Sequence, residues 1–191
     1  MASRTDNAGE LLKNLPVPED DGAADGLEGS ELPPVALTST AGGSVDLSAL
    51  PGTTVVYCYP MTGGSDGDVP DGWDDIPGAR GCTPQSCAFR DHHAELSGLG
   101  ARVFGLSTQG TDYQREAARR LRLPYELLSD AGLAFVRGVG LPTFEVEGTV
   151  LTKRLTMILK EGRIEKAFYP VFPPDRNAEE VIGWLSARAT S

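Results

Sequence analysis

The chain has 191 residues, with 27 aspartates and glutamates against 17 lysines and arginines, and a formal net charge of −10. This length suits one domain with a sizeable core. Phosphate-backbone binding needs a basic surface, so the charge argues against a nucleic-acid partner. No stretch reaches the ~20 apolar residues of a membrane span, and the opening MASRTDNAGELLKNLP lacks the apolar core of a secretory signal. We therefore expect a protein of the reducing cytoplasm with no membrane partner.

The first thirty residues differ from the rest of the chain. They are polar and rich in glycine and acidic residues, with the run Glu19-Asp20-Asp21. Such a composition buries too little apolar surface to offset the entropy lost on folding. We expect a flexible acidic N-terminal tail over residues 1–30 and one folded domain over residues 31–191.

Strand patterns begin directly after this segment. Short strands are predicted at Val35–Leu37 and Val45–Leu47, on either side of an Ala-Gly-Gly turn. The run Thr54–Tyr59 is β-branched and aromatic, which is typical of a strand buried on both faces. Residues 61–81 are dense in glycine, aspartate and proline, and an irregular segment of this length is commonly a lid or a binding loop.

Helical patterns then alternate with further strands. A helix is predicted over Thr83–Leu96, where apolar residues and histidines repeat at helical spacing. The segment Ala101–Ser107 has the pattern of a strand. A second helix is expected to begin at Thr111, with Gln114 completing a capping box.

The C-terminal part continues the alternation. Strands are predicted at Tyr125–Leu128, Thr143–Val146, Leu155–Leu159 and Ile164–Tyr169. Asn177, with Glu180 three residues later, is expected to cap a final helix. Strands that alternate with amphipathic helices and end in a hairpin and a helix indicate an α/β three-layer sandwich.

Cys82 lies where a loop gives way to a helix, in the segment Gly81-Cys82-Thr83-Pro84. Pro84 marks the first helical turn, where its missing N–H costs nothing. A thiol here faces unpaired backbone N–H groups and the positive end of the helix dipole, and both stabilise the nucleophilic thiolate. The alternative is a small residue that only occupies the helix cap, although cysteine is a poor cap and Thr83 is available beside it.

Cys87 follows five residues later. If both cysteines were helical, their Cα atoms would lie about 8–9 Å apart, whereas a disulfide requires less than about 7 Å. A Cys82–Cys87 bond therefore requires local unwinding of the first turn, which suits a redox switch better than a structural bond. The alternative is an inert Cys87 thiol packed inside the helix. Cys58, within the β-branched strand, is expected to be a buried core residue.

Metal binding by Cys82, Cys87, His92 and His93 is a further alternative. Structural zinc sites use closer cysteines with a second distant ligand pair. Two adjacent histidines on a regular helix also cannot both face one ion. A metal site is therefore disfavoured, and we expect no bound cofactor.

The segment GCTPQSCAFRD, residues 81–91, resembles the active-site segment of Q-type peroxiredoxins. These are also called bacterioferritin-comigratory proteins and belong to the alkyl hydroperoxide reductase/thiol-specific antioxidant family. The likeness extends over roughly Leu32 to Leu185 and includes TVVYCYPMT, ARVFGLST, YELLSD and the RLTMIL segment that begins at Arg154. The resemblance implies a thioredoxin-like three-layer α/β/α sandwich with a central mixed sheet.

The resemblance also implies an antioxidant peroxidase activity and roles for single residues. Cys82 is then the peroxidatic cysteine, Cys87 the resolving cysteine, and Arg154 the residue that helps to hold the thiolate and the peroxide. The substrate would be hydrogen peroxide or an organic hydroperoxide, and a thioredoxin-like dithiol would reduce the resulting intramolecular disulfide. The preferred peroxide, the physiological reductant and the choice between monomer and homodimer are left open.

One feature departs from the family pattern Pro-x-x-x-Thr-x-x-Cys. Here nineteen residues, 63–81, separate Thr62 from Cys82. Either the loop brings Thr62 back to the site, or the role of its hydroxyl is lost or taken by Thr83. The residues expected to line the substrate pocket are Thr62, Arg90 and Phe89, with Thr83 beside the catalytic cysteine.

Two other functions compete with a peroxidase. A thioredoxin-like disulfide oxidoreductase is disfavoured because the chain lacks a C-x-x-C motif. A non-enzymatic thiol redox sensor or binding module with a thioredoxin-like fold would use the same two cysteines to signal to a partner. Repeated catalytic turnover with a thioredoxin system would distinguish an enzyme from a sensor, which would be oxidised once and recycle slowly.

Overall fold

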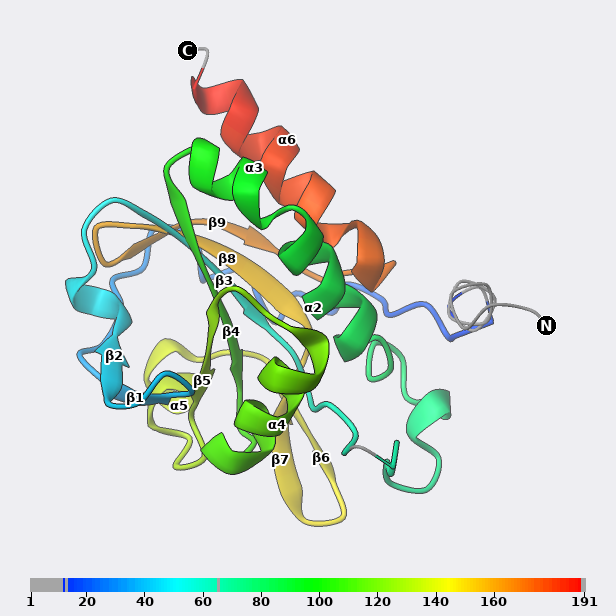
Figure 1. The fold of residues 1–191 in the computed structure, drawn as a ribbon. Coiled ribbons are helices and arrows are strands. Elements are labelled where there is room, and N and C mark those ends of the chain that lie inside the picture. The colour runs from blue at the N-terminus through cyan, green and yellow to red at the C-terminus, as the bar shows by residue number, and fades with distance from the viewer. Residues whose placement is uncertain (1–11, 13, 65, 190–191) are drawn as a thin grey trace.

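The computed structural model describes residue 12 and residues 14–64 and 66–189. A seven-stranded sheet in the order β2-β1-β5-β4-β3-β8-β9 runs through the middle of the molecule (Figure 1). Its strands are β1 (Ala36–Ser39), β2 (Ser44–Asp46), β3 (Thr53–Cys58), β4 (Ala101–Ser107), β5 (Glu126–Ser129), β8 (Leu155–Lys160) and β9 (Arg163–Phe168). A separate hairpin consists of β6 (Thr143–Val146) and β7 (Thr149–Thr152).

The large sheet is mixed. Strand β4 is parallel to both β3 and β5. Strand β8 is antiparallel to β3, β9 is antiparallel to β8, and β1 is antiparallel to β2 and β5. The predicted α/β fold with a central mixed sheet is therefore confirmed, and so are the hairpin at the start of the domain and the one near its end.

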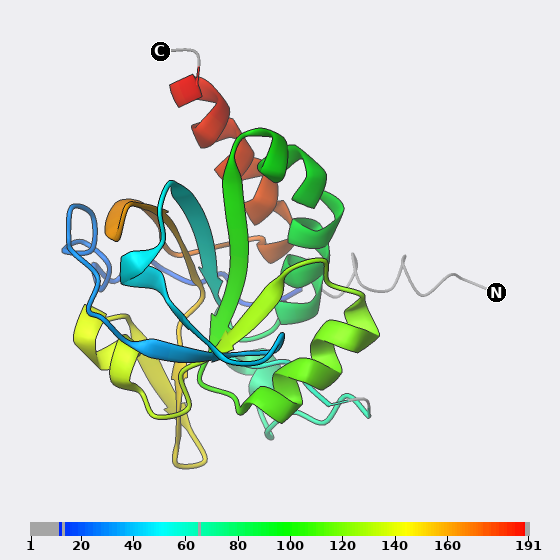
Figure 2. The same cartoon turned by 60° about the vertical axis from the view of Figure 1, so that its left-hand side comes forward.

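Helices cover both faces of the sheet. One face carries α2 (Cys82–Asp91), α3 (His93–Gly98), α4 (Thr111–Leu121) and α6 (Asn177–Ala189), and the other carries α5 (Ala134–Val139). In Figures 1 and 2 α2 and α6 run side by side, with α5 on the opposite side of the sheet. No helix among the described residues is long and apolar enough to cross a membrane.

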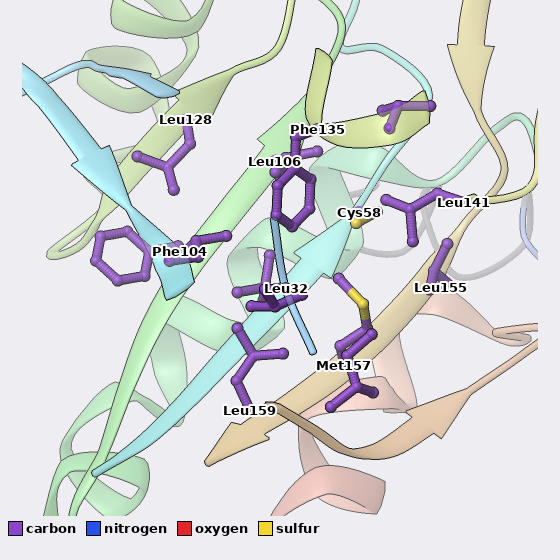
Figure 3. Close-up of a cluster of buried hydrophobic side chains, with 14 of the residues drawn as sticks. Leu32, Cys58, Phe104, Leu106, Leu128, Phe135, Leu141, Leu155, Met157 and Leu159 are labelled. Carbon is purple, nitrogen blue, oxygen red and sulfur yellow. The ribbon is translucent and has the colours of Figure 1, made fainter. Parts of the chain in front are cut away.

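Strand β3 is buried on both faces, as its composition predicts. Val55 and Tyr57 pack against the helices of the α2 side, whereas Val56 and Cys58 pack into the cluster on the other side. Figure 3 shows Cys58 inside this second cluster, beside residues of β8. Its side chain is fully buried, and this burial, helped by the charge of Asp130, raises the pKa of the Cys58 thiol. Cys58 is therefore an inert core residue, as expected.

The helix predicted over Thr83–Leu96 is in fact two helices. α2 ends at Asp91 and α3 begins at His93, with His92 between them at φ −96° and ψ 7°. The sequence pattern also gave no indication of the short helix α5. Its first turn is held by a nearby carboxylate, because Asp130, just after β5, accepts hydrogen bonds from the N–H groups of Phe135 and Val136.

Both predicted helix caps are wrong. Thr111 is the first residue of α4 and the cap position belongs to Gly110, which forms no side-chain cap. The Gln114 amide instead donates to Ser107 Oγ and to the Leu128 carbonyl, which joins α4 to the sheet. Asn177 likewise has helical backbone angles; its Oδ1 accepts from Gln85 and Thr156 on other elements, while its Nδ2 donates to Glu180 Oε2 at 3.4 Å. Tertiary partners therefore take the polar groups that local capping would have used.

Part of the predicted acidic tail is packed against the domain. Residues 1–11 and 13 lie outside the described residues, but Leu27 is 4% exposed and belongs to the core. Asp21 pairs with Lys153, and Glu28 pairs with Lys166. The expectation of a flexible tail is therefore wrong for residues 14–30. One apolar residue and two acidic residues with basic partners hold this segment.

Candidate active site

Cys82 is the first residue of α2, as the Pro84 signal predicts. The preceding Gly81 has φ 115°, and a Cβ built there would lie only 2.4 Å from Pro174 Cγ. A glycine is thus required by the backbone conformation and by the close approach of the proline. The cysteine is 4% exposed, so its sulfur lies in a largely water-excluded place at the helix start.

Arg154, on the connection between β7 and β8, lies against the sulfur of Cys82. Its Nη2 is 3.1 Å from Cys82 Sγ and also donates to the Ala79 carbonyl at 3.0 Å. The arginine is 3% exposed. The guanidinium therefore places a positive charge and a hydrogen-bond donor directly against the sulfur in a site with little water.

A buried hydrogen-bond chain holds the guanidinium in place. Arg154 Nη1 donates to Gln85 Oε1, and Gln85 Nε2 donates to Asn177 Oδ1 at 3.0 Å. The Thr156 hydroxyl donates to the same Asn177 oxygen at 2.6 Å. The chain thus connects α2, α6 and β8 behind the reactive sulfur, and each of its members is buried.

Sequence reasoning missed this chain. The one usable signal was Gln85, which stands three residues after Cys82 and therefore on the same side of the helix. The guanidinium also keeps one buried N–H group, at Nε, without a partner among the described residues. A buried donor without a partner is costly, and such groups are characteristic of sites that gain an acceptor when a ligand enters.

A pocket of about 230 Å³ opens onto Cys82. It is lined by Leu12, Met61, Thr62, Gly63, Val69, Trp73, Arg80, Gly81, Cys82, Thr83 and Pro84. The long loop therefore returns Thr62 to the cysteine, and Thr83 lies on the same pocket. Thr62 thus lies on the pocket of Cys82, and the role of its hydroxyl there stays a prediction.

Thr62 is held by the side-chain amide of Gln109. Gln109 Oε1 accepts from the Thr62 N–H at 2.9 Å and from its hydroxyl at 3.3 Å, and Gln109 Nε2 donates to the Thr62 carbonyl at 3.0 Å. Thr62 is 2% exposed. This paired contact fixes the start of the inserted loop, residues 63–81, beside the pocket. Gln109 belongs to no sequence motif that would have predicted this contact.

The inserted loop has a small core of its own. Trp73 is 2% exposed, and its ring centroid lies 6.2 Å from that of Phe144 on β6. Ala79 and Leu151 complete this cluster. The loop is thereby fastened to the β6–β7 hairpin, and it gives the pocket the apolar side chains of Met61, Val69 and Trp73.

Phe89 and Arg90 do not line this pocket, so that expectation is wrong. Phe89 is fully buried and stacks on Tyr57 with 4.7 Å between ring centroids. Arg90 donates to Asp91 and to the Leu121 carbonyl. Both residues follow Cys82 by about two helical turns, roughly 10 Å along the axis, which removes them from the helix start.

Cys87 lies on the same helix as Cys82, and all three cysteines are free thiols. It is half-buried, and this burial raises the pKa of its thiol, while the nearby positive charge of Arg90 opposes the rise. The folded state therefore holds Cys87 as a neutral thiol, separated by helical backbone from Cys82.

Comparisons with known proteins agree with this site. The Redoxin family model matches residues 27–182. The chloroplastic peroxiredoxin Q of Sedum lineare is 30% identical over 161 residues, which cover 84% of this chain and 78% of the relative. That of Gentiana triflora is 31% identical over 161 residues, which cover 84% of this chain and 67% of the relative.

Solved structures lead to the same fold. Peroxidoxin BcpB from Mycobacterium tuberculosis superimposes with a TM-score of 0.68 at 25% identity, over 84% of this chain and 97% of that one. Peroxiredoxin Q from Xanthomonas campestris has a TM-score of 0.65 at 22% identity, over 92% of this chain and 98% of that one, which supports the fold. With a buried cysteine at a helix start against a buried arginine, the chain belongs to the Redoxin family as a Q-type peroxiredoxin, a thiol peroxidase.

Proposed function

We propose that this enzyme reduces hydrogen peroxide or organic hydroperoxides by a two-cysteine cycle, with Cys82 peroxidatic and Cys87 resolving. The observation that carries the proposal is the contact of 3.1 Å between Arg154 Nη2 and Cys82 Sγ, with the cysteine lining the pocket of about 230 Å³. This contact places a fixed positive charge where both the attacking sulfur and the leaving oxygen carry negative charge.

In the first step the Cys82 thiolate attacks one peroxide oxygen and the O–O bond breaks. The sulfur becomes a sulfenic acid, and the other oxygen leaves, takes a proton and departs as water or an alcohol. The N–H groups at the start of α2 and the guanidinium of Arg154 stabilise the departing oxygen. Thr62 and Thr83 bring hydroxyl groups to the same pocket.

In the second step the first turn of α2 unwinds. The Cys87 thiol loses its proton and attacks the Cys82 sulfenic sulfur, the S–O bond breaks, and the leaving hydroxide takes up a proton and departs as water. A disulfide remains, which a thioredoxin-type dithiol reduces by exchange. Helical backbone between the two cysteines keeps the resolving thiol away from the sulfenic acid until this rearrangement.

The pocket wall supports organic hydroperoxides as substrates beside hydrogen peroxide. Met61, Val69 and Trp73 present apolar side chains to the space next to Cys82, and burial of an alkyl group against them is favourable. The bacterioferritin comigratory protein of Xanthomonas campestris, which shares the fold, is described for its alkyl peroxide reduction activity. We further propose that the cycle runs in a reducing cytoplasm, where a thioredoxin-type dithiol is kept reduced.

Mass spectrometry of the reduced protein after one equivalent of hydrogen peroxide tests the cycle. The wild type should lose two hydrogens at a Cys82–Cys87 bond, and the variant Cys87→Ser should accumulate a sulfenic acid on Cys82. Cys58→Ser is the matched control and should behave as the wild type. A free Cys82 thiol after this treatment would contradict the proposal, and a disulfide that involves Cys58 would contradict the assignment of Cys87.

A further inference from the structure

A broad groove of about 870 Å³ lies between α3, α4, β4 and β5, and its charge is opposite to that of the chain. Four arginines line it: Arg102, Arg115, Arg119 and Arg122, all exposed. Glu126 is its one lining carboxylate, and it accepts a hydrogen bond from Ser39. The chain as a whole has a formal net charge of −10, so this surface concentrates positive charge on an acidic protein.

Three of these arginines have no ion-pair partner among the described residues: Arg102, Arg119 and Arg122. Arg115 pairs only with the exposed Asp112. Many other cations of the chain are paired with carboxylates, for example Lys153, Lys166 and Arg163. Three unpaired cations that lie together in one groove present a surface complementary to an acidic partner.

The groove is also lined by apolar residues, among them Val103, Ala118, Leu123 and Pro124. Protein–protein interfaces commonly combine an apolar centre with a charged rim and are enriched in arginine. The groove is also wide and open, which suits the surface of a protein better than a small ligand.

One end of the groove lies beside Cys87. Tyr125 lines the groove, and its hydroxyl donates to the carbonyl of Ser86 at 2.8 Å, one residue before the cysteine. The His93 ring, also on the groove, lies 5.9 Å from that of Tyr125.

Cys87 is also the more accessible sulfur. Cys87 is half-buried, whereas Cys82, the first residue of α2, is only 4% exposed. A partner that sits in the groove therefore meets the resolving cysteine before the peroxidatic one.

We propose that this arginine groove (Arg102, Arg115, Arg119 and Arg122) docks the dithiol protein that reduces the enzyme, through an acidic face around its redox-active cysteines. The inference rests on the two-cysteine cycle proposed above. A thiolate of the bound reductant attacks Cys87 Sγ, the Cys82–Cys87 bond breaks, and Cys82 leaves as a thiolate beside Arg154. The second thiol of the reductant loses its proton and attacks the mixed disulfide, Cys87 leaves and takes a proton, and the reductant departs as a disulfide.

The groove is suited to the oxidised enzyme as well. The residues that must rearrange to form the disulfide lie within Cys82–Cys87, whereas the arginines lie on β4 and α4 and just after α4. The docking surface therefore stays in place when the first turn of α2 unwinds. Unwinding affects only the end of the groove at Tyr125, because the Tyr125 hydroxyl bonds to the Ser86 carbonyl.

Charge reversal tests the docking. The variant Arg102→Glu/Arg119→Glu changes the groove, and Arg137→Glu/Lys160→Glu is the matched control, with the same change in net charge at exposed positions on α5 and β8. The disulfide form of each is mixed with a purified thioredoxin of net negative charge at low ionic strength. We expect thioredoxin to reduce the groove variant at least about tenfold more slowly than the wild type, with a weaker dependence of the rate on salt. The control should match the wild type.

Dithiothreitol, a small uncharged dithiol, separates docking from disulfide reactivity. It should reduce the wild type and both variants at the same rate, and their oxidation by peroxide should also be equal. Equal rates with thioredoxin for all three proteins would overturn the proposal. An equal loss of rate with dithiothreitol would also overturn it. If the groove variant only dissociates a dimer, the occupant of the groove is a second copy of the chain, and the proposal is overturned as well. Failure of the wild type to form the disulfide would instead remove the two-cysteine cycle itself.

Discussion

Arg154 Nη2 lies 3.1 Å from Cys82 Sγ although the two residues are 72 positions apart in the chain. The arginine reaches the sulfur because β7 ends and β8 begins beside the start of α2, and Gln85 holds its other terminal nitrogen. The reactive centre is thus assembled from a helix start and a strand connection, with the guanidinium fixed before any substrate binds.

Replacement of Arg154 should slow the attack on peroxide. In Arg154→Met the thiolate and the leaving oxygen lose their fixed positive charge, and we expect the second-order rate constant with hydrogen peroxide to fall roughly 100-fold or more at pH 7. Stopped-flow measurement of Cys82 oxidation reports this rate. Arg176→Met, an exposed arginine on the connection to α6, is the control and should leave the rate unchanged. A rate within threefold of wild type in Arg154→Met would argue against the role of the guanidinium.

Asn177 should act as a positioning residue. Asn177→Ala removes the acceptor of both Gln85 Nε2 and the Thr156 hydroxyl, and leaves two buried donors without a partner. We expect the free energy of unfolding to fall by about 1–3 kcal/mol and the peroxide reaction to slow because Arg154 is less well held. Urea unfolding and stopped-flow oxidation measure the two effects. The variant Asn177→Asp, which keeps the acceptor, should recover most of the rate, and the absence of any recovery would favour a purely structural role.

Substitutions can rank the contributions of the Thr62 and Thr83 hydroxyl groups to the reaction with peroxide. Thr62→Val removes a buried hydroxyl that Gln109 orients at the pocket, whereas Thr83 is half-buried. We expect Thr62→Val to lower the rate with peroxide by about tenfold and Thr83→Val to have a smaller effect. Thr62→Ser should keep most of the activity. The reverse order in steady-state kinetics would assign the family's hydroxyl role to Thr83.

Gly81 should tolerate no side chain. Gly81→Ala forces a Cβ into Pro174 at a φ of 115°. We therefore expect the free energy of unfolding to fall by about 1–3 kcal/mol and Cys82 to react more slowly with peroxide. The control is Gly183→Ala in the exposed part of α6, where a Cβ meets nothing within 4 Å. That change should stabilise the protein by about 0.5–1 kcal/mol, because alanine is the better helix former. Denaturant titration compares the two, and equal stabilities would contradict the close approach of Pro174.

The docking of residues 14–30 should depend on pH. Hydrogen bonds from Lys153, then from Tyr169 and from the Ala23 N–H, lower the pKa of Asp21. A carboxylate whose pKa is lower in the folded state stabilises it above its unfolded pKa, near 4, and this contribution is lost as pH falls toward the folded value. We expect this segment to become more open to limited proteolysis by pepsin below about pH 4 than an internal reference site. Asp21→Asn should show the open pattern already at neutral pH, measured there with a protease active at pH 7, and full protection of this variant would contradict the prediction.

Much of the fold follows from local patterns in the sequence. The strand Ala101–Ser107 was predicted with its observed ends, and the buried β-branched run became the central strand β3. These elements could be read because the spacing of apolar residues and the identity of their neighbours depend only on the chain nearby. The helix α5 and the packing of Leu27 escaped prediction, because their apolar side chains pack into a cluster with residues of distant strands.

The sequence by itself determined that Cys82 begins a helix after Gly81 and before Pro84, with Cys87 further along the same helix. These are local relations, and backbone sterics and helix geometry are sufficient to specify them. Only the tertiary structure decided which side chains surround the sulfur. Arg154 and Gln85 meet across 69 positions, Gln85 and Asn177 across 92, and Thr62 and Gln109 across 47. Such contacts form only once the sheet and helices have packed, because no spacing along the chain brings these groups together.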